Sequence, residues 1–317
     1  MDSYSFEKKY VFGPVPSRRL GRSLGVDLVP FKTCTFDCIY CDLGRTTHKT
    51  IFRQPYVSPE GIRDEVELTL CHLERKPDYI TLSGSGEATL NNQVNEIIRK
   101  IKEITSIPLA VLTNGSLLFL DEVRKDLLEA DLVLQSLNAV TPALFGYIHR
   151  PASSLGIEEI ISGLVQFRQQ YRGQIWLEIF FCLGVNDGGA EVEGLKEAIG
   201  RIQPDRIQLN TVVRPTAEDF VFPLTPEKLE EIRITLGEKA EVISEVAPPL
   251  GDRFEVIKDS EIINLVRRRP CTAEDVSGGL GLHLGEATKH LAHLSQQGLI
   301  RYRMFQHRCY FEIASNR

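Results

Sequence analysis

Three cysteines lie close together in the stretch Lys32-Thr-Cys-Thr-Phe-Asp-Cys-Ile-Tyr-Cys-Asp-Leu-Gly44. Cys34, Cys38 and Cys41 have the spacing C-x3-C-x2-C and directly follow the short apolar run Leu24–Pro30, which we expect to be a strand. The other four of the chain's 7 cysteines are scattered singly: Cys71, Cys182, Cys271 and Cys309. An odd number of cysteines in a long chain argues against a disulfide framework and favours a metal site at the cluster.

Three clustered thiols leave open which metal they hold. Structural zinc usually takes four ligands, so a zinc site would need His48 as the fourth. An iron–sulfur cube accounts for the pattern better, because thiolates are its natural ligands and four irons normally take four cysteines. Three cysteines leave one iron with an open position, and an open metal position is typical of a catalytic site rather than a structural one.

Strand-like and helix-like runs alternate through most of the chain. Six runs are expected to be strands: Leu24–Pro30, Tyr79–Ser83, Leu109–Thr113, Leu132–Leu137, Ile175–Leu183 and Arg206–Val212. Each is followed by an expected helix: Pro59–Arg75, Asn91–Thr105, Leu120–Glu129, Ile157–Tyr171, Glu191–Ile202 and Thr225–Leu236. Strands that alternate with helices pair in parallel through right-handed crossovers, which fits either a doubly wound sheet or a full or partial barrel.

Polar residues at the strand ends favour the barrel. They fall at or just after the carboxyl ends of five strands: Cys34–Cys41, Ser83–Glu87, Thr113–Gly115, Ser136–Asn138 and Asn210–Arg214. Sites assembled from several strand ends are typical of barrels, whose loops converge on one face. We therefore expect an α/β fold built on a partial (β/α)6 barrel.

The pattern changes after about residue 245. Residues 246–258 contain two prolines and a glycine and are expected to be a linker between a barrel domain (1–245) and a small domain (259–317). The small domain is expected to contain three helices and a hairpin: Glu261–Arg269, Ala273–Gly279, Leu284–Gln297, and the strands Ile300–Met304 and Cys309–Ile313. This order predicts a winged-helix-like α+β domain.

The two parts differ in charge. Residues 258–317 carry nine Lys+Arg and six Asp+Glu, a net charge of +3; the whole chain carries 37 and 43, which leaves 28 and 37, a net charge of −9, for residues 1–257. This asymmetry fits a nucleic-acid contact by the small domain, and it fits equally a packing or dimerisation module with ordinary surface charge.

Composition narrows the class of protein. The chain is 42% hydrophobic and 25% charged, values typical of a folded soluble protein rather than a disordered or fibrous one. No apolar run approaches the roughly 18 residues that a membrane span needs. The first residues lack the apolar core of a signal peptide, so we expect a cytoplasmic protein that does not enter a membrane.

The cysteine spacing, with the aromatic Tyr40 before the last cysteine, resembles the signature of the radical S-adenosylmethionine (radical SAM) superfamily. The resemblance implies that Cys34, Cys38 and Cys41 bind a [4Fe–4S] cluster whose open iron chelates S-adenosylmethionine. It also implies reductive cleavage of S-adenosylmethionine to a 5′-deoxyadenosyl radical, which abstracts hydrogen from a substrate, and an electron donor of the flavodoxin or ferredoxin type.

A second motif, Ser83-Gly-Ser-Gly-Glu-Ala-Thr-Leu90, follows the next strand. It resembles the Gly-Gly-Glu motif of the same superfamily, with Ser85 in place of the first glycine. The resemblance implies that Gly86 lets the backbone approach the methionine moiety and that Glu87 accepts a hydrogen bond from its ammonium. By itself the motif is indistinguishable from an ordinary turn between a strand and a helix.

Further strand ends supply the other expected cofactor-binding residues. Thr113 and Asn114 end the third strand, and Ser136 and Asn138 end the fourth with their side chains on one face. The resemblance implies contacts with the ribose and the methionine carboxylate here, although many relatives have Asp at the position of Asn138. Asn210, on the sixth strand, is expected at the adenine.

Arginines are the expected substrate contacts. We predict that Arg150, rather than its neighbour His149, reaches the active face, and that Arg214 does so after the sixth strand. Arg18, Arg19 and Arg22 form a basic loop before the first strand; they fit either a phosphorylated or carboxylate substrate or a loop exposed to solvent.

Several segments resemble the group that contains the tRNA wyosine-synthesis enzymes, over roughly residues 10–245: Gly84–Leu90, Leu112–Gly115, Gln135–Ala139 and Ile148–Pro151. Those enzymes have further cysteines upstream of the triple motif, whereas no cysteine precedes Cys34 here. The substrate therefore stays open between an RNA base and a small metabolite or partner protein. An iron–sulfur winged-helix regulator without turnover is the alternative from a different class.

Overall fold

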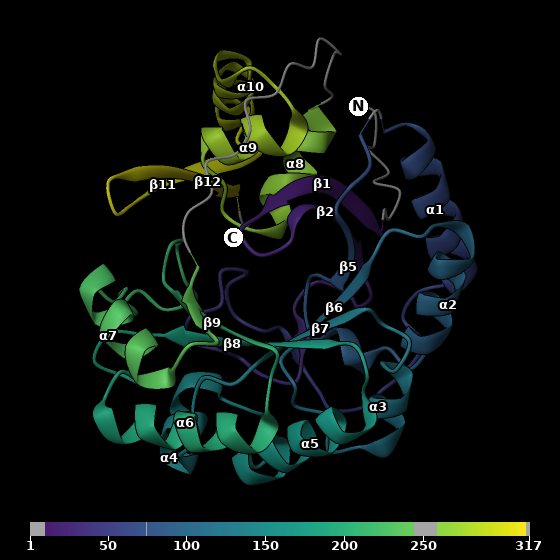
Figure 1. Cartoon of the computed structure of the whole chain (residues 1–317). Coiled ribbons are helices and arrows are strands. Elements are labelled where there is room, and N and C mark those ends of the chain that lie inside the picture. The colour runs from purple at the N-terminus through teal and green to yellow at the C-terminus, as the bar shows by residue number, and fades with distance from the viewer. Residues whose placement is uncertain (1–9, 74, 244–258, 315–317) are drawn as a thin grey trace.

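The computed structural model describes residues 10–73, 75–243 and 259–314. Its centre is one curved sheet of eight strands in the order β1-β2-β5-β6-β7-β8-β9-β10. These are β1 (Val11–Ser17), β2 (Gly21–Asp27), β5 (Tyr79–Ser83), β6 (Leu109–Thr113), β7 (Leu132–Ser136), β8 (Gln174–Phe181), β9 (Arg206–Thr211) and β10 (Ala240–Val242). All neighbours pair in parallel except β1 and β2, and β1 and β10 stay at the edges, so the barrel is partial (Figure 1).

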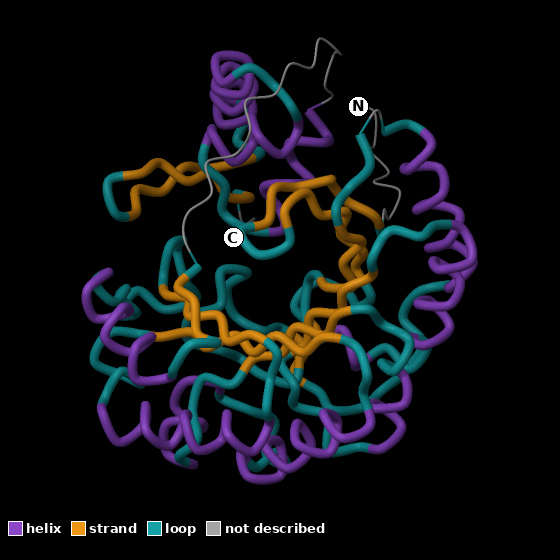
Figure 2. Tube along the Cα trace, viewed as in Figure 1, coloured by secondary structure: helices purple, strands orange, loops and turns teal. Residues whose placement is uncertain are grey.

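The six predicted strands are confirmed as β2, β5, β6, β7, β8 and β9. Helices follow them on the outer side of the sheet, as Figure 2 shows: α1 (Pro59–Cys71), α2 (Val94–Ile104), α3 (Asp121–Asp126), α4 (Pro142–His149), α5 (Ile157–Gln170), α6 (Gly189–Ile202) and α7 (Pro226–Leu236). Of these helices, only α4 was not expected. The side chains of Ser58 and Thr225 accept backbone hydrogen bonds at the starts of α1 and α7, each before a proline at the first helical position.

Both faces of the sheet are covered, which explains why its strands are almost continuously apolar. Alternate residues, such as Ile80 and Leu82 on β5, pack under the helices. The opposite face carries a smaller apolar cluster inside the barrel, formed by Leu20, Ala110, Leu132, Leu134 and Trp176. Toward the carboxyl ends of β7 to β9 this inner face becomes polar, and there the candidate site begins.

The C-terminal segment folds as predicted into three helices and a hairpin: α8 (Asp259–Arg268), α9 (Ala273–Leu280), α10 (Leu284–Gln296), β11 (Ile300–Phe305) and β12 (Arg308–Ile313). It has a core of its own, in which Leu291 and Leu294 of α10 are fully buried. We call residues 259–314 the C-terminal module. Its winged-helix character stays a prediction, and the predicted linker (246–258) lies outside the described residues.

The C-terminal module packs against the barrel beside β1 (Figure 1). Val15 of β1 packs against the core of the module, and the Tyr310 hydroxyl donates to the carbonyl of Val213, 2.7 Å away, in the loop after β9. The module therefore contacts the edge strand β1 and the loop that follows β9, the strand next to the other edge strand, β10. None of the described helices is long and apolar enough to span a membrane.

Candidate functional site

Of the three predicted metal ligands, Cys34 ends β3 (Thr33–Cys34), and Cys38 and Cys41 lie in the loop that connects it to β4 (His48–Lys49), with which β3 pairs. All three cysteines are free and half-buried. Each sulfur lies next to one nitrogen: Cys34 beside the Asn114 amide (3.6 Å), Cys38 beside the His149 Nδ1 (3.3 Å) and Cys41 beside the Lys32 Nζ (3.3 Å). A sulfur that accepts from nitrogen donors is better suited to the thiolate than to the thiol state.

Without a bound metal cluster, burial opposes ionisation of these cysteines. Burial, with the charge of Glu87, raises the pKa of Cys34 to about 12, and burial with the neighbouring Cys41 and Cys34 raises the pKa of Cys38. A metal cluster removes this penalty because its ligands bind as thiolates. The three thiols and their nitrogen donors therefore fit an iron–sulfur cluster.

The arrangement does not fit a single metal ion. Among the described residues, no three His, Cys, Asp or Glu side chains are grouped as the ligands of one ion would be. The cysteines of an iron–sulfur cube bind different irons, so they need not converge on one point. His48, which a zinc site would have required, is exposed on β4. The geometry favours the cluster over the zinc alternative.

The Ser85–Glu87 loop packs directly on the cysteine loop. A Cβ on Gly86 would lie 1.8 Å from the carbonyl oxygen of Thr33, so only glycine allows this approach. Two backbone hydrogen bonds tie the loops together, from Lys32 to Ser85 (2.5 Å) and from Glu87 to Thr33 (3.1 Å). The two motifs that lie far apart in sequence thus form one surface, with Gly86 at their contact.

Glu87 is held by hydrogen bonds within the protein. Its carboxylate is 2% exposed and accepts four hydrogen bonds, from the amide and hydroxyl of Thr89 (3.0 and 2.6 Å), the hydroxyl of Thr113 (2.6 Å) and the amide of Asn114 (2.7 Å). It therefore joins the loop after β5 to the end of β6, and its contact with a cofactor ammonium stays a prediction. Through Thr113 and Asn114 it also holds the Asn114 amide beside Cys34.

Tyr40 and Asn138, predicted to contact the cofactor, contact each other. The ring of Tyr40 stacks on Phe180 with centroids 4.4 Å apart, and its hydroxyl accepts from the Asn138 amide at 2.6 Å. The other end of that amide accepts from the backbone of Phe180 at 2.7 Å, and Asn138 is 1% exposed. Asn138 thus fixes Tyr40 beside the cysteine loop. Ser136 lies half-buried two residues before it on β7.

Asn210 is the centre of a polar group on β8 and β9. Its amide donates to Glu178 at 2.9 Å, and its carbonyl accepts from Arg18 at 3.2 Å. Arg19 pairs with the same Glu178 at 2.8 Å. Arg18 and Arg19 form the turn between β1 and β2, so the basic loop reaches into the barrel and is not a solvent-exposed turn.

The preference for Arg150 over His149 as a substrate or cofactor contact stays a prediction. Arg150 follows α4 in a left-handed conformation, and its guanidinium pairs at 2.5 Å with Glu218, whose amide donates to the carbonyl of Ile39 in the cysteine loop. His149 is buried and is the residue that contacts Cys38. Burial lowers the pKa of His149 to about 3, which keeps the ring neutral. Arg214 pairs with Asp275 of the C-terminal module at 3.4 Å.

The sequence interpretation missed two residues at this site, Lys32 and Asp27, and ranked a third, His149, behind Arg150. Lys32 and His149 approach the cysteine sulfurs, and Asp27 at the end of β2 supports the Ser85 loop. Lys32 stands two residues before Cys34, which was a usable signal. His149 and Asp27 come near the motifs only through the fold, so spacing could not have found them.

Asp27 connects the Ser85 loop to the C-terminal module. One carboxylate oxygen accepts from the amide and hydroxyl of Ser85 (3.1 and 3.3 Å), and the other pairs with Arg268 of α8. Arg268 also lies over the ring of Phe12, 3.6 Å from its centroid. Both charged side chains are largely buried, so the pair is the point at which module, β1 hairpin and motif meet.

Replacing Arg268 with glutamine is expected to loosen this junction. The change leaves Asp27 buried without a cation, at a cost of about 2 kcal/mol in unfolding free energy for a pair that is not fully buried. Hydrogen exchange should show faster exchange in α8 and in the Ser83–Glu87 loop together. Arg201→Gln, which breaks an exposed pair with Glu158, is the control. Slower exchange in the loop, or no change, would contradict the coupling.

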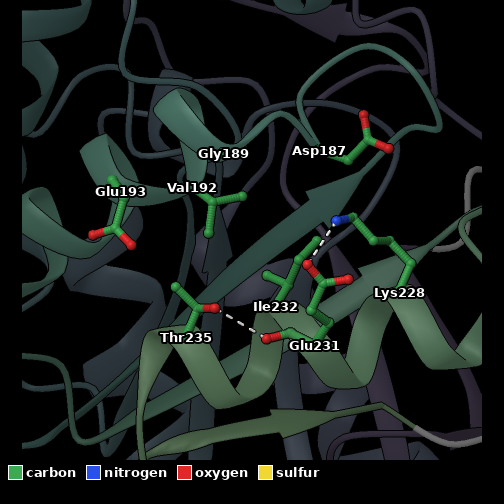
Figure 3. A pocket seen from close by; sticks show the side chains of 8 residues that line it. All are labelled: Asp187, Gly189, Val192, Glu193, Lys228, Glu231, Ile232 and Thr235. Atoms are coloured by element: carbon green, nitrogen blue, oxygen red, sulfur yellow. Dashed lines mark hydrogen bonds and ion pairs between the residues drawn. The ribbon is translucent and has the colours of Figure 1, made fainter.

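A shallow pocket outside the barrel is a poor candidate for the site. Figure 3 shows it between α6 and α7, where Lys228 and Glu231 pair with each other at 3.0 Å. Its other lining residues include Asp187 and Glu193, and no cysteine or arginine lines it. Lys228 and Glu231 already pair with each other, and no residue that lines this pocket belongs to the cysteine motif or to the Ser83–Leu90 motif.

Comparison with known proteins agrees with this geometry. Residues 28–195, more than half of the chain, match the model of the radical SAM superfamily, which supports a [4Fe–4S] cluster and S-adenosylmethionine as the expected cofactors. The chain is 35% identical over 245 residues to the UPF0026 protein MJ1312 of Methanocaldococcus jannaschii, covering 77% of this chain and 75% of that protein.

Two further matches bear on length and fold. The chain is 35% identical over 297 residues to a protein of Brachyspira hyodysenteriae named GTPase Obg, covering 92% of this chain but only 43% of that protein, so it spans less than half of that relative. The solved structure of TYW1 with a lysine-pyruvate adduct bound has a TM-score of 0.51 at 18% identity, over 71% of this chain and 75% of that one, which shows the shared fold. The chain belongs to the radical SAM superfamily and, within it, groups with the UPF0026 proteins.

Proposed function

We propose that this chain is a radical SAM enzyme whose cluster is held by Cys34, Cys38 and Cys41. The observation that carries the proposal is the contact between the cysteine loop and the Ser85–Glu87 loop, which puts three thiols beside a close backbone approach at Gly86. When bound, the cluster and S-adenosylmethionine supply one-electron cleavage of a carbon–sulfur bond and, through it, hydrogen abstraction from a substrate.

The chain's own residues bind, orient and exclude water. Asn114 and Lys32 donate to the sulfurs of Cys34 and Cys41, which stabilises added negative charge on them, and His149 places its Nδ1 beside the sulfur of Cys38. The backbone of Ser85 and Gly86 is the proposed contact for the methionine moiety, with Glu87 holding that loop in place. The stacked rings of Tyr40 and Phe180 cover one side of the site and keep water from it.

Ser136 and Asn210 are the proposed contacts for the nucleoside part, because both lie on the inner face at the ends of β7 and β9, on either side of β8. We also propose that residues 259–317 form a separate winged-helix-like domain that adjoins the substrate. The electrons would come from a cytoplasmic donor of the flavodoxin or ferredoxin type. These assignments extend the family membership to particular residues and partners of this chain.

The proposal is tested by anaerobic reconstitution of the full chain with iron and sulfide, followed by dithionite and S-adenosylmethionine. We expect release of 5′-deoxyadenosine or of a product that carries the adenosyl group, measured by liquid chromatography and mass spectrometry. The reaction without dithionite is the control and should release neither. An iron-replete protein that leaves S-adenosylmethionine intact would show that the proposed activity is wrong.

A further inference from the structure

Four arginines from three parts of the chain lie close together at the inner ends of β8 and β9. We call them the arginine cluster: Arg18, Arg19, Arg214 and Arg269. Arg18 and Arg19 come from the β1–β2 turn, Arg214 from the loop after β9 and Arg269 from the C-terminal module. We propose that the arginine cluster binds a carboxylate or phosphate group of a small-molecule substrate. This inference rests on the proposed function, because it names the substrate class of the same site.

Contacts join Arg18 and Arg19, and electrostatic interactions with Arg18 place Arg214 and Arg269 near them. Arg18 donates to Asn210 at 3.2 Å, and Asn210 donates to Glu178 at 2.9 Å. Glu178 in turn pairs with Arg19 at 2.8 Å. Burial together with the charges of Arg214, Arg19 and Arg269 lowers the pKa of Arg18 to about 10. Like charges held this close repel one another unless an anion lies among them.

The carboxylates present do not satisfy all four guanidinium groups. Glu178 pairs with Arg19 and Asp275 with Arg214. Within the described part of the chain, Arg18 hydrogen-bonds only the neutral carbonyl of Asn210, with Glu178 in electrostatic reach, and Arg269 has no side-chain partner.

Two buried donor atoms of the arginine cluster also lack an acceptor. Arg19 Nη1 lies 2.8 Å from Glu178 without hydrogen-bond geometry, and Arg214 Nε has no acceptor within the described residues. Buried donors without acceptors are costly and rare in folded proteins. An anion with two or three oxygen atoms would meet both the unpaired charge and the unpaired donors, since guanidinium groups bind carboxylate and phosphate through paired N–H donors.

The arginine cluster adjoins the proposed radical site without being part of the cysteine loop. Phe180, which stacks on Tyr40 with ring centroids 4.4 Å apart, lies opposite Asn210 in the pairing of β8 with β9, so the arginine cluster adjoins the aromatic pair beside Cys41. Burial acts to lower the pKa of Arg214, but Asp275 and Asp42 outweigh it. An anionic group held here would place the rest of a short substrate next to the cofactor.

The surroundings favour a small molecule over a nucleic acid. The arginines lie between strand ends and the C-terminal module and are not spread along an exposed face: Arg19 and Arg214 have only 20% and 15% of their side chains exposed. A nucleic-acid surface needs basic groups along several phosphates, whereas residues 1–257 carry a net charge of −9. The site is suited to one anionic group.

Isothermal titration calorimetry on the reconstituted full chain tests the inference. Inorganic phosphate and acetate are titrated separately at constant ionic strength, with and without saturating S-adenosylmethionine. We expect saturable binding of at least one anion in both conditions. Arg18→Gln and Arg269→Gln should each weaken it about tenfold or more, because each removes charge-assisted hydrogen bonds. Arg201→Gln on α6 should bind as the unaltered chain does. Circular dichroism checks that each variant is folded, and Arg269→Gln decides the matter if Arg18→Gln does not fold.

Several results would overturn the inference. Lack of saturable binding, or binding unaffected by either variant, would remove the site. Binding abolished by S-adenosylmethionine would assign the arginines to the cofactor carboxylate. Displacement of phosphate by a single-stranded RNA, with steep salt dependence, would assign them to nucleic acid. Since calorimetry does not depend on turnover, a chain that binds the anion but leaves S-adenosylmethionine intact would count against the proposed function alone.

Discussion

Replacing Cys38 with alanine is expected to abolish both the cluster and the cleavage of S-adenosylmethionine. A cluster with one of its three protein thiolates removed loses an iron ligand, and the cysteine loop holds no further cysteine to replace it. We expect iron and sulfide contents to fall to a small fraction of those in the unaltered chain, and 5′-deoxyadenosine release to fall to background.

Cys71→Ala is the matched control, because Cys71 is exposed at the end of α1 and belongs to no motif. This variant should retain iron, visible absorption and cleavage. If Cys38→Ala kept its cluster while Cys71→Ala lost it, the assignment of the ligands would have to change.

The second large effect is expected from Gly86→Ala. The added Cβ would lie 1.8 Å from the Thr33 carbonyl, so the backbone of one loop must move. Displacement of about 1 Å at a cofactor site can cost ~100-fold in rate, and we expect a loss of that size in S-adenosylmethionine cleavage. Overpacking should also lower the unfolding free energy by about 2 kcal/mol.

Gly200→Ala separates this effect from a general effect of added bulk. Gly200 lies in α6, and a Cβ added there would meet no atom within 4 Å, so alanine should stabilise the helix slightly and leave cleavage unchanged. Denaturant unfolding and cleavage rates of both variants give the comparison. A Gly86→Ala enzyme with normal cleavage would show that the two loops need not touch as closely as described.

The sequence predicted the parallel strands well because their periodicity and their helix starts are local signals. Ser58 and Thr225 cap α1 and α7. Strand β1 was missed because its sequence, with Pro14 and Pro16, is typical of a loop; proline is tolerated there because β1 is an edge strand. Strand β10 has only three residues, too few for a periodic pattern.

The site was predicted less completely than the fold. Cysteine spacing and the Ser83–Leu90 motif were sufficient to bring the two loops together. The direction of individual side chains could not be predicted from these motifs, because it depends on partners distant in sequence. Glu87 accepts from Thr113, and Asn138 donates to Tyr40. Arg150 was preferred to His149, but Arg150 at the end of α4 pairs with Glu218, whereas His149 contacts Cys38.

The carboxylate of Asp27 contacts both Ser85 and Arg268, and so couples the ordering of the Ser85 loop to the docking of the C-terminal module. If docking of the C-terminal module orders the Ser85 loop, thermodynamic linkage requires that a ligand bound to the ordered loop strengthen docking by the same factor. Binding at the cofactor site would then be measurable in the C-terminal module, as slower hydrogen exchange in α8. A chain shortened to the barrel would lose that coupling and would bind the cofactor to a less ordered loop.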